Sequence, residues 1–282
     1  MFVVKVPYDR GGGEKSFGAK YGPDAIEKAF RRFSWRAAED GVSHPKVEFV
    51  ETPQTPYHNT GVSPNLDAFF AAGERSLVVL SGDNSVSRMS AEAVDRFSTD
   101  PYLVLLDAHP DAGDPASHDP HASWVRKLWE QHVVRPERTF FFGIRDPEED
   151  EMRYVKESGA TLTSSDTLSR ISPQVVVSNL MLHKKINPRG GLIFVVDIDV
   201  IDPSQAPGTG VLRSPGLELR TVLQLISVFG DMPFSLKVGE ISEVIPYEGD
   251  MLRPPGDRRP DPAGLTVLAA EAILRQMIRS FA

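Results

Sequence analysis

The sequence places five possible metal ligands directly after two apolar runs. They are Asp107, His109 and Asp111, which follow residues 103–106, and Asp197 and Asp199, which follow residues 192–196. Alternate side chains of an extended chain point to the same side, so each set aims its ligand atoms together. Oxygen ligands with one or two imidazoles favour Mn²⁺, with Zn²⁺, Fe²⁺, Co²⁺ or Ni²⁺ as alternatives. The pattern predicts a site for one or two divalent cations.

A structural interpretation of the same residues stays open at this point. Each aspartate can cap the turn or helix that follows it, and His109 can be a hydrogen-bonded histidine of the core. A single D-x-D pattern fits either interpretation about equally well. Two clusters at the ends of two apolar runs favour the metal site.

These runs belong to a longer series of predicted strands and helices. Apolar or β-branched segments predict strands at 2–6, 47–50, 77–80, 102–106, 139–142, 192–196 and 235–238. Amphipathic segments predict helices at 23–33, 91–97, 123–131, 148–158, 218–228 and 265–278. Their alternation indicates an α/β fold with a mainly parallel sheet covered on both faces, and such sheets bind ligands at the carboxyl ends of their strands. We expect one domain over residues 1–282, with a long surface loop at Met251–Pro262.

The composition excludes several classes of protein and site. The chain has 282 residues, 40% of them apolar, which is enough for one large core, and no cysteine, so thiolate zinc sites and cysteine nucleophiles are excluded. The net charge of −8 argues against a general binder of nucleic acid or of anionic membranes. No apolar run approaches the ~20 residues that span a bilayer, and the N-terminus lacks a secretory signal pattern. We therefore expect a cytoplasmic protein.

Two motifs resemble the signatures of the ureohydrolases, the arginase, agmatinase and formimidoylglutamase family. Residues 107–111 are similar to its D-A-H-x-D motif, and residues 197–203 and 206–210 are similar to its D-x-D-x-x-D-P and A-P-G-T-G segments. Shorter matches lie at 6–9, 11–12, 21–26, 143–145, 243–246, 261, 264–266 and 269–270. The resemblance implies the family's single-domain, three-layer arginase-like fold.

The resemblance also implies roles for the matching metal ligands. Asp107 and Asp197 would bridge two metal ions, His109 and Asp199 would complete one site, and Asp111 would belong to the other. In the family, the metal ions activate a hydroxide that attacks the carbon of a guanidino or formimino group. The resemblance therefore implies Mn²⁺ or a similar cofactor, as one or two ions.

Two further residues match positions that act on the substrate. Glu243 would accept hydrogen bonds from its cationic, nitrogen-rich group, and His121 would shuttle a proton near the mouth of the site. The predicted catalytic set is thus His121, Glu243 and Asp111. The alternatives are a buried glutamate satisfied by backbone donors and a surface histidine at a helix start, with His118 as a rival for the catalytic role.

One residue departs from the family pattern at a ligand position. The family's G-G-D-H-S is here Ser-Gly-Asp-Asn-Ser at 81–85, so Asn84 replaces a histidine ligand. An amide oxygen is a poorer donor to transition metals, so we predict that the site shared with Asp111 is weakened and that one ion is held better than two. Glu240, where the family commonly has Asp, is a milder change that keeps the charge.

The leading hypothesis is a metal-dependent hydrolase of a linear C–N bond in a guanidino or formimino compound, similar to agmatinases or formimidoylglutamases. The alternative is a catalytically reduced homologue with a structural, regulatory or ligand-binding role, which Asn84 favours. A metal-dependent deacetylase shares a related scaffold, but its motifs do not extend over the first 30 residues.

The predicted partner is a small-molecule substrate, and the family resemblance implies a homo-oligomer. Arginine is disfavoured as substrate because residues 112–117 lack the Asn-rich pattern with which arginases hold an amino-acid head group. A charged substrate tail could instead meet Asp114, Glu218 or Arg213.

Overall fold

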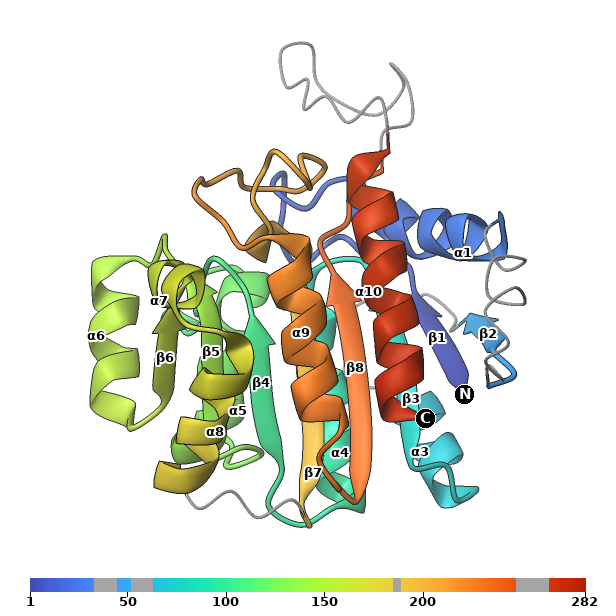
Figure 1. The fold of residues 1–282 in the computed structure, drawn as a ribbon, viewed down its shortest axis with the longest axis horizontal. Helices are drawn as coiled ribbons and strands as arrows, with labels where there is room; N and C mark the ends of the chain where they lie inside the picture. The colour runs from blue at the N-terminus through green and yellow to red at the C-terminus, as the bar shows by residue number, and fades with distance from the viewer. Residues whose placement is uncertain (33–44, 52–62, 185–188, 247–263) are drawn as a thin grey trace.

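A parallel sheet with helices on both faces forms the protein. The computed structural model describes residues 1–32, 45–51, 63–184, 189–246 and 264–282 (Figure 1). The sheet order is β2-β1-β3-β8-β7-β4-β5-β6, and every pair of neighbours in it is parallel. The strands are β1 (Phe2–Val6), β2 (Glu48–Glu51), β3 (Ser76–Ser81), β4 (Tyr102–Leu106), β5 (Thr139–Ile144), β6 (Thr161–Ser164), β7 (Gly191–Asp197) and β8 (Leu236–Ser242).

Two layers of helix cover the two faces of this sheet (Figure 1). The α-helices are α1 (Gly22–Arg32), α3 (Ser63–Ala71), α4 (Ser87–Phe97), α5 (Trp124–Glu130), α6 (Glu149–Ser158), α7 (Ser165–Arg170), α8 (Pro173–Lys184), α9 (Leu219–Gly230) and α10 (Leu265–Phe281). One layer contains α8, α9 and α10, and the other contains α3, α4 and α5. The three layers agree with the predicted arginase-like architecture.

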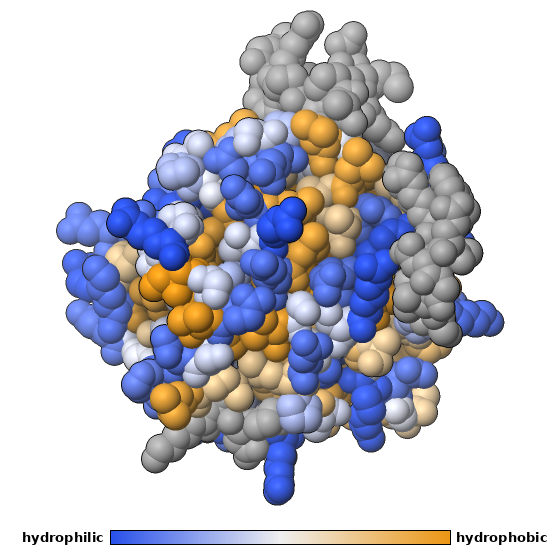
Figure 2. All heavy atoms as spheres, viewed as in Figure 1, coloured by the Kyte–Doolittle hydropathy of each residue, from blue (hydrophilic) through white to orange (hydrophobic). Residues whose placement is uncertain are grey.

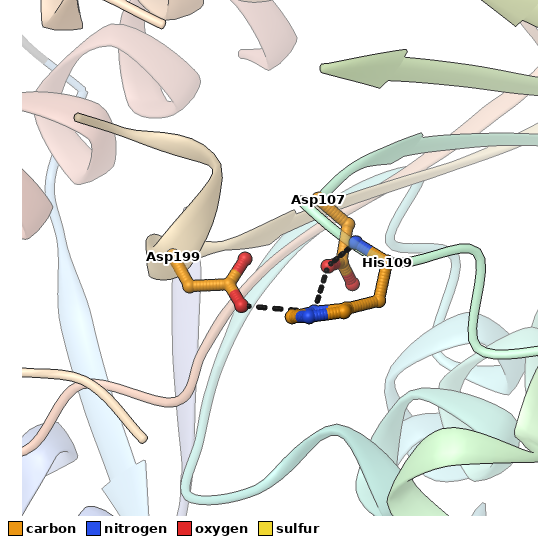
Figure 3. A group of neighbouring side chains, drawn as sticks. All are labelled: Asp107, His109 and Asp199. Carbon is orange, nitrogen blue, oxygen red and sulfur yellow. Dashed lines mark hydrogen bonds and ion pairs between the residues drawn. The ribbon is translucent and has the colours of Figure 1, made fainter. Parts of the chain in front are cut away.

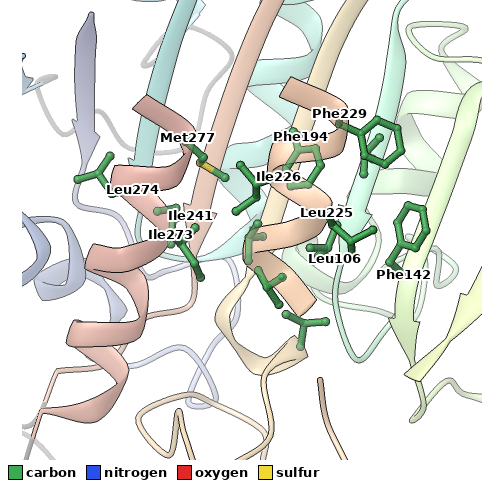
Figure 4. Close-up of a cluster of buried hydrophobic side chains, with 14 of the residues drawn as sticks. Leu106, Phe142, Phe194, Leu225, Ile226, Phe229, Ile241, Ile273, Leu274 and Met277 are labelled. Atoms are coloured by element: carbon green, nitrogen blue, oxygen red, sulfur yellow. The ribbon is translucent and has the colours of Figure 1, made fainter. Parts of the chain in front are cut away.

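Strand residues alternate between the two cores because successive side chains of a strand point to opposite faces. On β4, Val104 and Leu106 belong to the core under α9 and α10, whereas Leu103 and Leu105 belong to the core under α4 and α5. The first core combines aliphatic side chains with packed aromatic rings (Figure 4). The ring centroid of Phe229 of α9 lies 5.7 Å from that of a phenylalanine of β7 and 5.9 Å from that of one of β5. Burial on both faces explains why these strands are apolar throughout.

The outward face of α8, α9 and α10 carries mostly hydrophilic side chains with smaller hydrophobic areas between them (Figure 2). Within the described ranges, no helix combines the length and the apolar character needed to cross a membrane.

The predicted strands and helices are confirmed, with a few differences at their ends. The structure adds β6, α3, α7 and α8, which the sequence patterns did not predict. β6 has only four residues, and α8 begins with a run of β-branched valines, which favour strands by propensity. The last residue of the predicted helix 23–33 and the predicted loop Met251–Pro262 lie outside the described residues.

β8 differs most from its prediction, because it continues to Ser242 instead of ending at 238. Gly239 and Glu240 interrupt the apolar pattern there. A Cβ atom on Gly239 would lie 2.8 Å from Met277 and from Phe281, so the glycine makes room for α10. The extension matters because Ser242 then pairs with Asp197 at the carboxyl end of β7.

Glu240 is fully buried in this extension, and one of its oxygens accepts a hydrogen bond of 2.8 Å from Ser87 Oγ. The other oxygen, like Ser90 Oγ, has no hydrogen-bond partner in the part of the chain that the structure describes. Burial raises the pKa of Glu240 above its ordinary value of 4.5, although the hydrogen bond from Ser87 acts to lower it. The folded protein therefore holds this proton more tightly than the unfolded chain, so the free energy of unfolding falls as the pH rises above that value.

We expect Glu240→Gln to be more stable than the wild type at pH 8, because the amide keeps the shape of the side chain and removes the buried charge. The thermal midpoint should rise by about 2–4 °C at pH 8, and the difference should disappear near pH 4. Calorimetry over this pH range measures it, with Glu157→Gln on the exposed surface of α6 as the control. A variant that is less stable than the wild type at pH 8 would contradict the argument.

Candidate active site

A cavity of about 770 Å³ opens at the carboxyl edge of the sheet. The predicted site residues that line it are Asn84, His109, Asp111, His121, Asp197, Asp199 and Glu243. The remaining one, Asp107, is fully buried beside His109 at the end of β4. The topology thus brings together residues that are up to 159 positions apart in the sequence.

Asp107, His109 and Asp199 point toward one another and form the best-defined group of possible metal ligands (Figure 3). Nδ1 of His109 lies 3.1 Å from Oδ2 of Asp199 and 3.4 Å from Oδ1 of Asp107. One ligand atom from each residue lies within 4.8 Å of the other two. Two carboxylates and an imidazole at this separation suit a divalent transition metal.

Backbone donors hold the two carboxylates of this group in place. Asp107 Oδ1 accepts a hydrogen bond of 2.7 Å from the His109 amide, and Asp199 Oδ1 accepts one of 3.0 Å from the Ala108 amide. Asp199 lies in the 3-10 turn η5 (Ile198–Val200), and its backbone amide donates a hydrogen bond of 2.8 Å to the capping side chain of Asp197. Asp197 therefore has the capping role that the structural interpretation assigned to these aspartates, whereas Asp199 is held by the Ala108 amide and turns its Oδ2 toward His109.

The two aspartates of this group stabilise a positive charge on His109. Burial opposes ionisation of His109, but Asp199 and Asp107 raise the pKa of His109 to about 12. Burial likewise acts to raise the pKa of Asp199, yet His109, the Ala108 amide and Arg145 hold it below its ordinary value. A metal ion that binds here must displace the proton of His109 and can then take over its charge.

Asn84 lies at the centre of a second set of carboxylates. Its Nδ2 atom donates hydrogen bonds to Oδ2 of Asp197 at 2.6 Å, of Asp111 at 3.1 Å and of Asp107 at 3.3 Å. Its Oδ1 atom accepts a hydrogen bond from Ser242 Oγ. The residue thus offers its nitrogen, not its oxygen, to the three carboxylates.

Asp111 adopts a left-handed backbone conformation, with φ of 50°, which is uncommon for a residue other than glycine. The backbone carbonyl of Asp111 accepts a hydrogen bond from the backbone amide of Val125, and its Oδ2 accepts one of 2.7 Å from Trp124 Nε1. The sequence analysis did not identify Trp124. Its place three residues after His121 was the available signal, because a buried indole needs an acceptor.

Glu243 follows β8 and also has a left-handed backbone, with φ of 59°. Its Oε1 atom accepts hydrogen bonds of 3.0 Å from Ser16 Oγ and 3.0 Å from the backbone amide of Asn84. Burial raises the pKa of Glu243 to about 8, with further repulsion from Asp83. Glu243 is thus buried and has a backbone donor, as the alternative interpretation expected. Its second oxygen, Oε2, is left to interact with a molecule in the cavity. Ser16 was missed because no local pattern joins it to Glu243.

His121 lies in the turn η3 (Pro120–Ala122), and its Nδ1 atom is 3.1 Å from the Gly11 carbonyl. A carbonyl only accepts, so Nδ1 carries the hydrogen and Nε2 is left as an acceptor. Burial lowers the pKa of His121, which keeps the ring neutral. His118, the rival candidate, also lines the cavity, but it pairs with Glu148 at 3.1 Å. The geometry favours His121 as a proton acceptor.

The other matching segments support these residues. Gly143 has φ of 94° and packs against Val200, and Arg145 donates hydrogen bonds to the carbonyls of Val200 and Arg213. Gly208 donates to Thr266 Oγ1 at 2.7 Å at the start of α10. Arg145 and Thr266 therefore fasten the segment that follows β7 over the cavity.

Of the three residues considered for a substrate tail, Arg213 lines the cavity, whereas Asp114 and Glu218 are not among its lining residues. Glu218 instead directly precedes α9, and the Asp114 carboxylate accepts from the Ala116 amide.

Comparisons with known proteins agree with the family resemblance of the sequence motifs. The model of the arginase family matches residues 1–279. An agmatinase of Halalkalibacterium halodurans is 25% identical over 212 residues, which are 73% of this chain and 64% of that protein, so the chain spans somewhat less than two thirds of this relative. The formimidoylglutamase structure from Bacillus subtilis superposes with a TM-score of 0.82 at 20% identity, over 99% of this chain and 85% of that one. A Trypanosoma cruzi formiminoglutamase structure with Mn²⁺ has a TM-score of 0.78 at 19% identity, over 99% of this chain and 92% of that one. Both structures have the same fold as this chain.

Proposed function

Because the chain belongs to the arginase family, we propose that it is a metal-dependent hydrolase of a linear C–N bond in a guanidino or formimino compound. The observation that carries this proposal is the convergence of Asp107, His109 and Asp199 at the cavity. A divalent cation held there would lower the pKa of a water molecule toward neutrality and so supply a nucleophile. We propose Mn²⁺ as this cation, as found with the Trypanosoma cruzi neighbour.

The chain's own residues would then position the substrate and move protons. Glu243 keeps one oxygen for the planar, cationic group of the substrate, since Ser16 Oγ and the backbone amide of Asn84 hold the other oxygen. Burial raises the pKa of Glu243 to about 8, and the positive charge of that group would favour the ionised carboxylate. His121 has a neutral ring with Nε2 as acceptor and can take a proton at the cavity. Asp111 orients the site through its bonds to Asn84 and Trp124.

A lysine at the cavity is available for a substrate with an acidic tail. Asp146 is paired with Arg213 at 2.5 Å, and Glu148 is paired with His118 at 3.1 Å. Lys15 lines the same cavity, is exposed and has no ion pair with any residue that the structure describes. We propose that Lys15 receives a carboxylate tail of the substrate.

Turnover on a panel of compounds tests the proposed function. The panel should hold guanidino and formimino compounds, each with a carboxylate tail and with an amine tail, and release of urea or of formamide is measured with added Mn²⁺. We expect turnover that chelator abolishes, with kcat/KM higher for the carboxylate tails by about 10-fold or more. Preference for amine tails would refute only the proposal that the substrate has an acidic tail. No turnover on any compound would refute the proposed hydrolase activity.

The second candidate function is a catalytically reduced homologue that keeps the metal site for another role. The observation that favours it is Asn84, which takes a ligand position and turns its nitrogen toward the carboxylates. A thermal midpoint that rises with Mn²⁺ but no turnover on the panel would support it. The expected homo-oligomer and the cytoplasmic location stay predictions, and light scattering of the purified chain tests the first.

A further inference from the structure

Asn84 presents hydrogen-bond donors at the point where three carboxylates converge. Its Nδ2 atom lies between 2.6 and 3.3 Å from oxygens of Asp197, Asp111 and Asp107. An amide nitrogen donates two hydrogens and accepts nothing, so it cannot ligate a cation. A metal ion bound by these three carboxylates would meet the positive end of the amide dipole instead of a ligand atom.

Ser242 determines which end of the amide faces the carboxylates. Its hydroxyl donates to Asn84 Oδ1 and thereby holds the oxygen away from them. Ser242 is fully buried at the end of β8, where its backbone is in register with Asp197. If the amide turned round, this hydroxyl would have to donate elsewhere, and the Val196 carbonyl is 3.5 Å away, which makes a weak bond.

The three carboxylates need such a donor in the absence of a second cation. All three are buried, and like charges this close repel one another. The two amide hydrogens are shared among one oxygen of each of the three carboxylates and add no charge. Asn84 therefore does for these carboxylates, by hydrogen bonding, part of what a cation would do by charge.

We propose that the Asn84 amide, oriented by Ser242, takes the place of a second cation and limits the protein to one metal ion at Asp107, His109 and Asp199. The inference rests on the metal site of the proposed function and is independent of which reaction the site catalyses. Ser242 is thus a positioning residue that sets the metal stoichiometry.

Metal stoichiometry in Asn84→Asp tests this inference directly. The variant has the same size and replaces the donor with a carboxylate oxygen. Metal-stripped protein is titrated with Mn²⁺, dialysed and measured by elemental analysis and by electron paramagnetic resonance. We expect one ion per chain with the spectrum of an isolated Mn²⁺ in the wild type, and two ions with an exchange-coupled spectrum in Asn84→Asp.

Ser242→Ala provides a second test that leaves Asn84 in place. Without the hydroxyl the amide can turn its oxygen to the carboxylates, so a second Mn²⁺ should bind at least about 10-fold more tightly than in the wild type. The matched control is Ser81→Ala, since Ser81 is also buried at a neighbouring strand end and donates to the Ile241 carbonyl, not to Asn84. The control should bind one ion.

Circular dichroism verifies the fold of each variant, and Ser242→Ala keeps the test decisive if Asn84→Asp fails to fold. Two tightly held ions in the wild type, or one ion in both folded variants, would overturn the inference. Wild-type protein that holds one ion but turns over no compound supports the inference while contradicting the hydrolase. Protein that binds no Mn²⁺ would overturn the metal site and this inference with it.

Discussion

Asp199→Ala is expected to lower kcat by about 10²-fold or more, which is the loss typical when a group that stabilises developing charge is removed. Asp199 offers Oδ2 to the metal group, 3.1 Å from His109 Nδ1, while its Oδ1 accepts from the Ala108 amide. Asp107, His109 and Asp199 form the proposed metal-binding triad. The substitution removes one of these three ligands and leaves the other two in place. Turnover on the preferred compound of the panel, with Mn²⁺ in excess, gives the measurement.

The thermal midpoint of the same variant separates loss of metal from loss of fold. Binding to the native state stabilises it by mass action, so the wild-type midpoint should rise with Mn²⁺ and fall with chelator. In Asp199→Ala the midpoint should respond to neither. Asp95→Ala, an exposed aspartate of α4, is the control and should behave as the wild type. An Asp199→Ala variant with full activity would show that the triad does not hold the catalytic metal.

Glu243→Gln is expected to lower kcat/KM by about 10²-fold on guanidino compounds, because an amide cannot form the charge-assisted bonds that a carboxylate makes with a cationic group. The amide oxygen can still accept from Ser16 Oγ and from the Asn84 backbone, so the local structure should persist. Metal content should stay unchanged, since Glu243 is not one of the triad. Steady-state kinetics together with elemental analysis distinguishes these effects.

Ser16→Ala is the matched control for Glu243. It removes one of the two hydrogen bonds that orient the carboxylate and keeps its charge, so the loss of kcat/KM should be smaller than in Glu243→Gln. Equal losses in the two variants would mean that Glu243 acts only by holding the loop that contains Ser16. Wild-type kinetics in Glu243→Gln would remove it from substrate binding.

The sequence predicted the sheet and the residues at its carboxyl edge because both depend on local patterns. An apolar run such as 102–106 predicts a buried strand, and the polar residue after it must lie at the strand end. Asp107 and Asp197 were placed in this way, and parallel pairing of β4 with β7 brings them to one edge. No knowledge of distant contacts was needed for this step.

The orientation of Asn84 could not be predicted, because it depends on residues far away in the chain. Ser242, which fixes the amide, is 158 positions from it, and Asp197, its nearest acceptor, is 113 positions from it. The sequence predicted a weakened ligand at this position, whereas the structure shows a donor aimed at three carboxylates. β8 was predicted to end at 238, so Ser242 could not have been considered as a neighbour of the site.

Turnover during a titration of metal-free protein with Mn²⁺ shows whether one metal ion per chain is sufficient for hydrolysis. The protein concentration is kept above the dissociation constant, and hydrolysis of the preferred compound is measured after each addition. We expect a rate that rises linearly and stops rising at one equivalent of Mn²⁺ per chain. A rate that first appears between one and two equivalents, or one that does not depend on Mn²⁺, would contradict it.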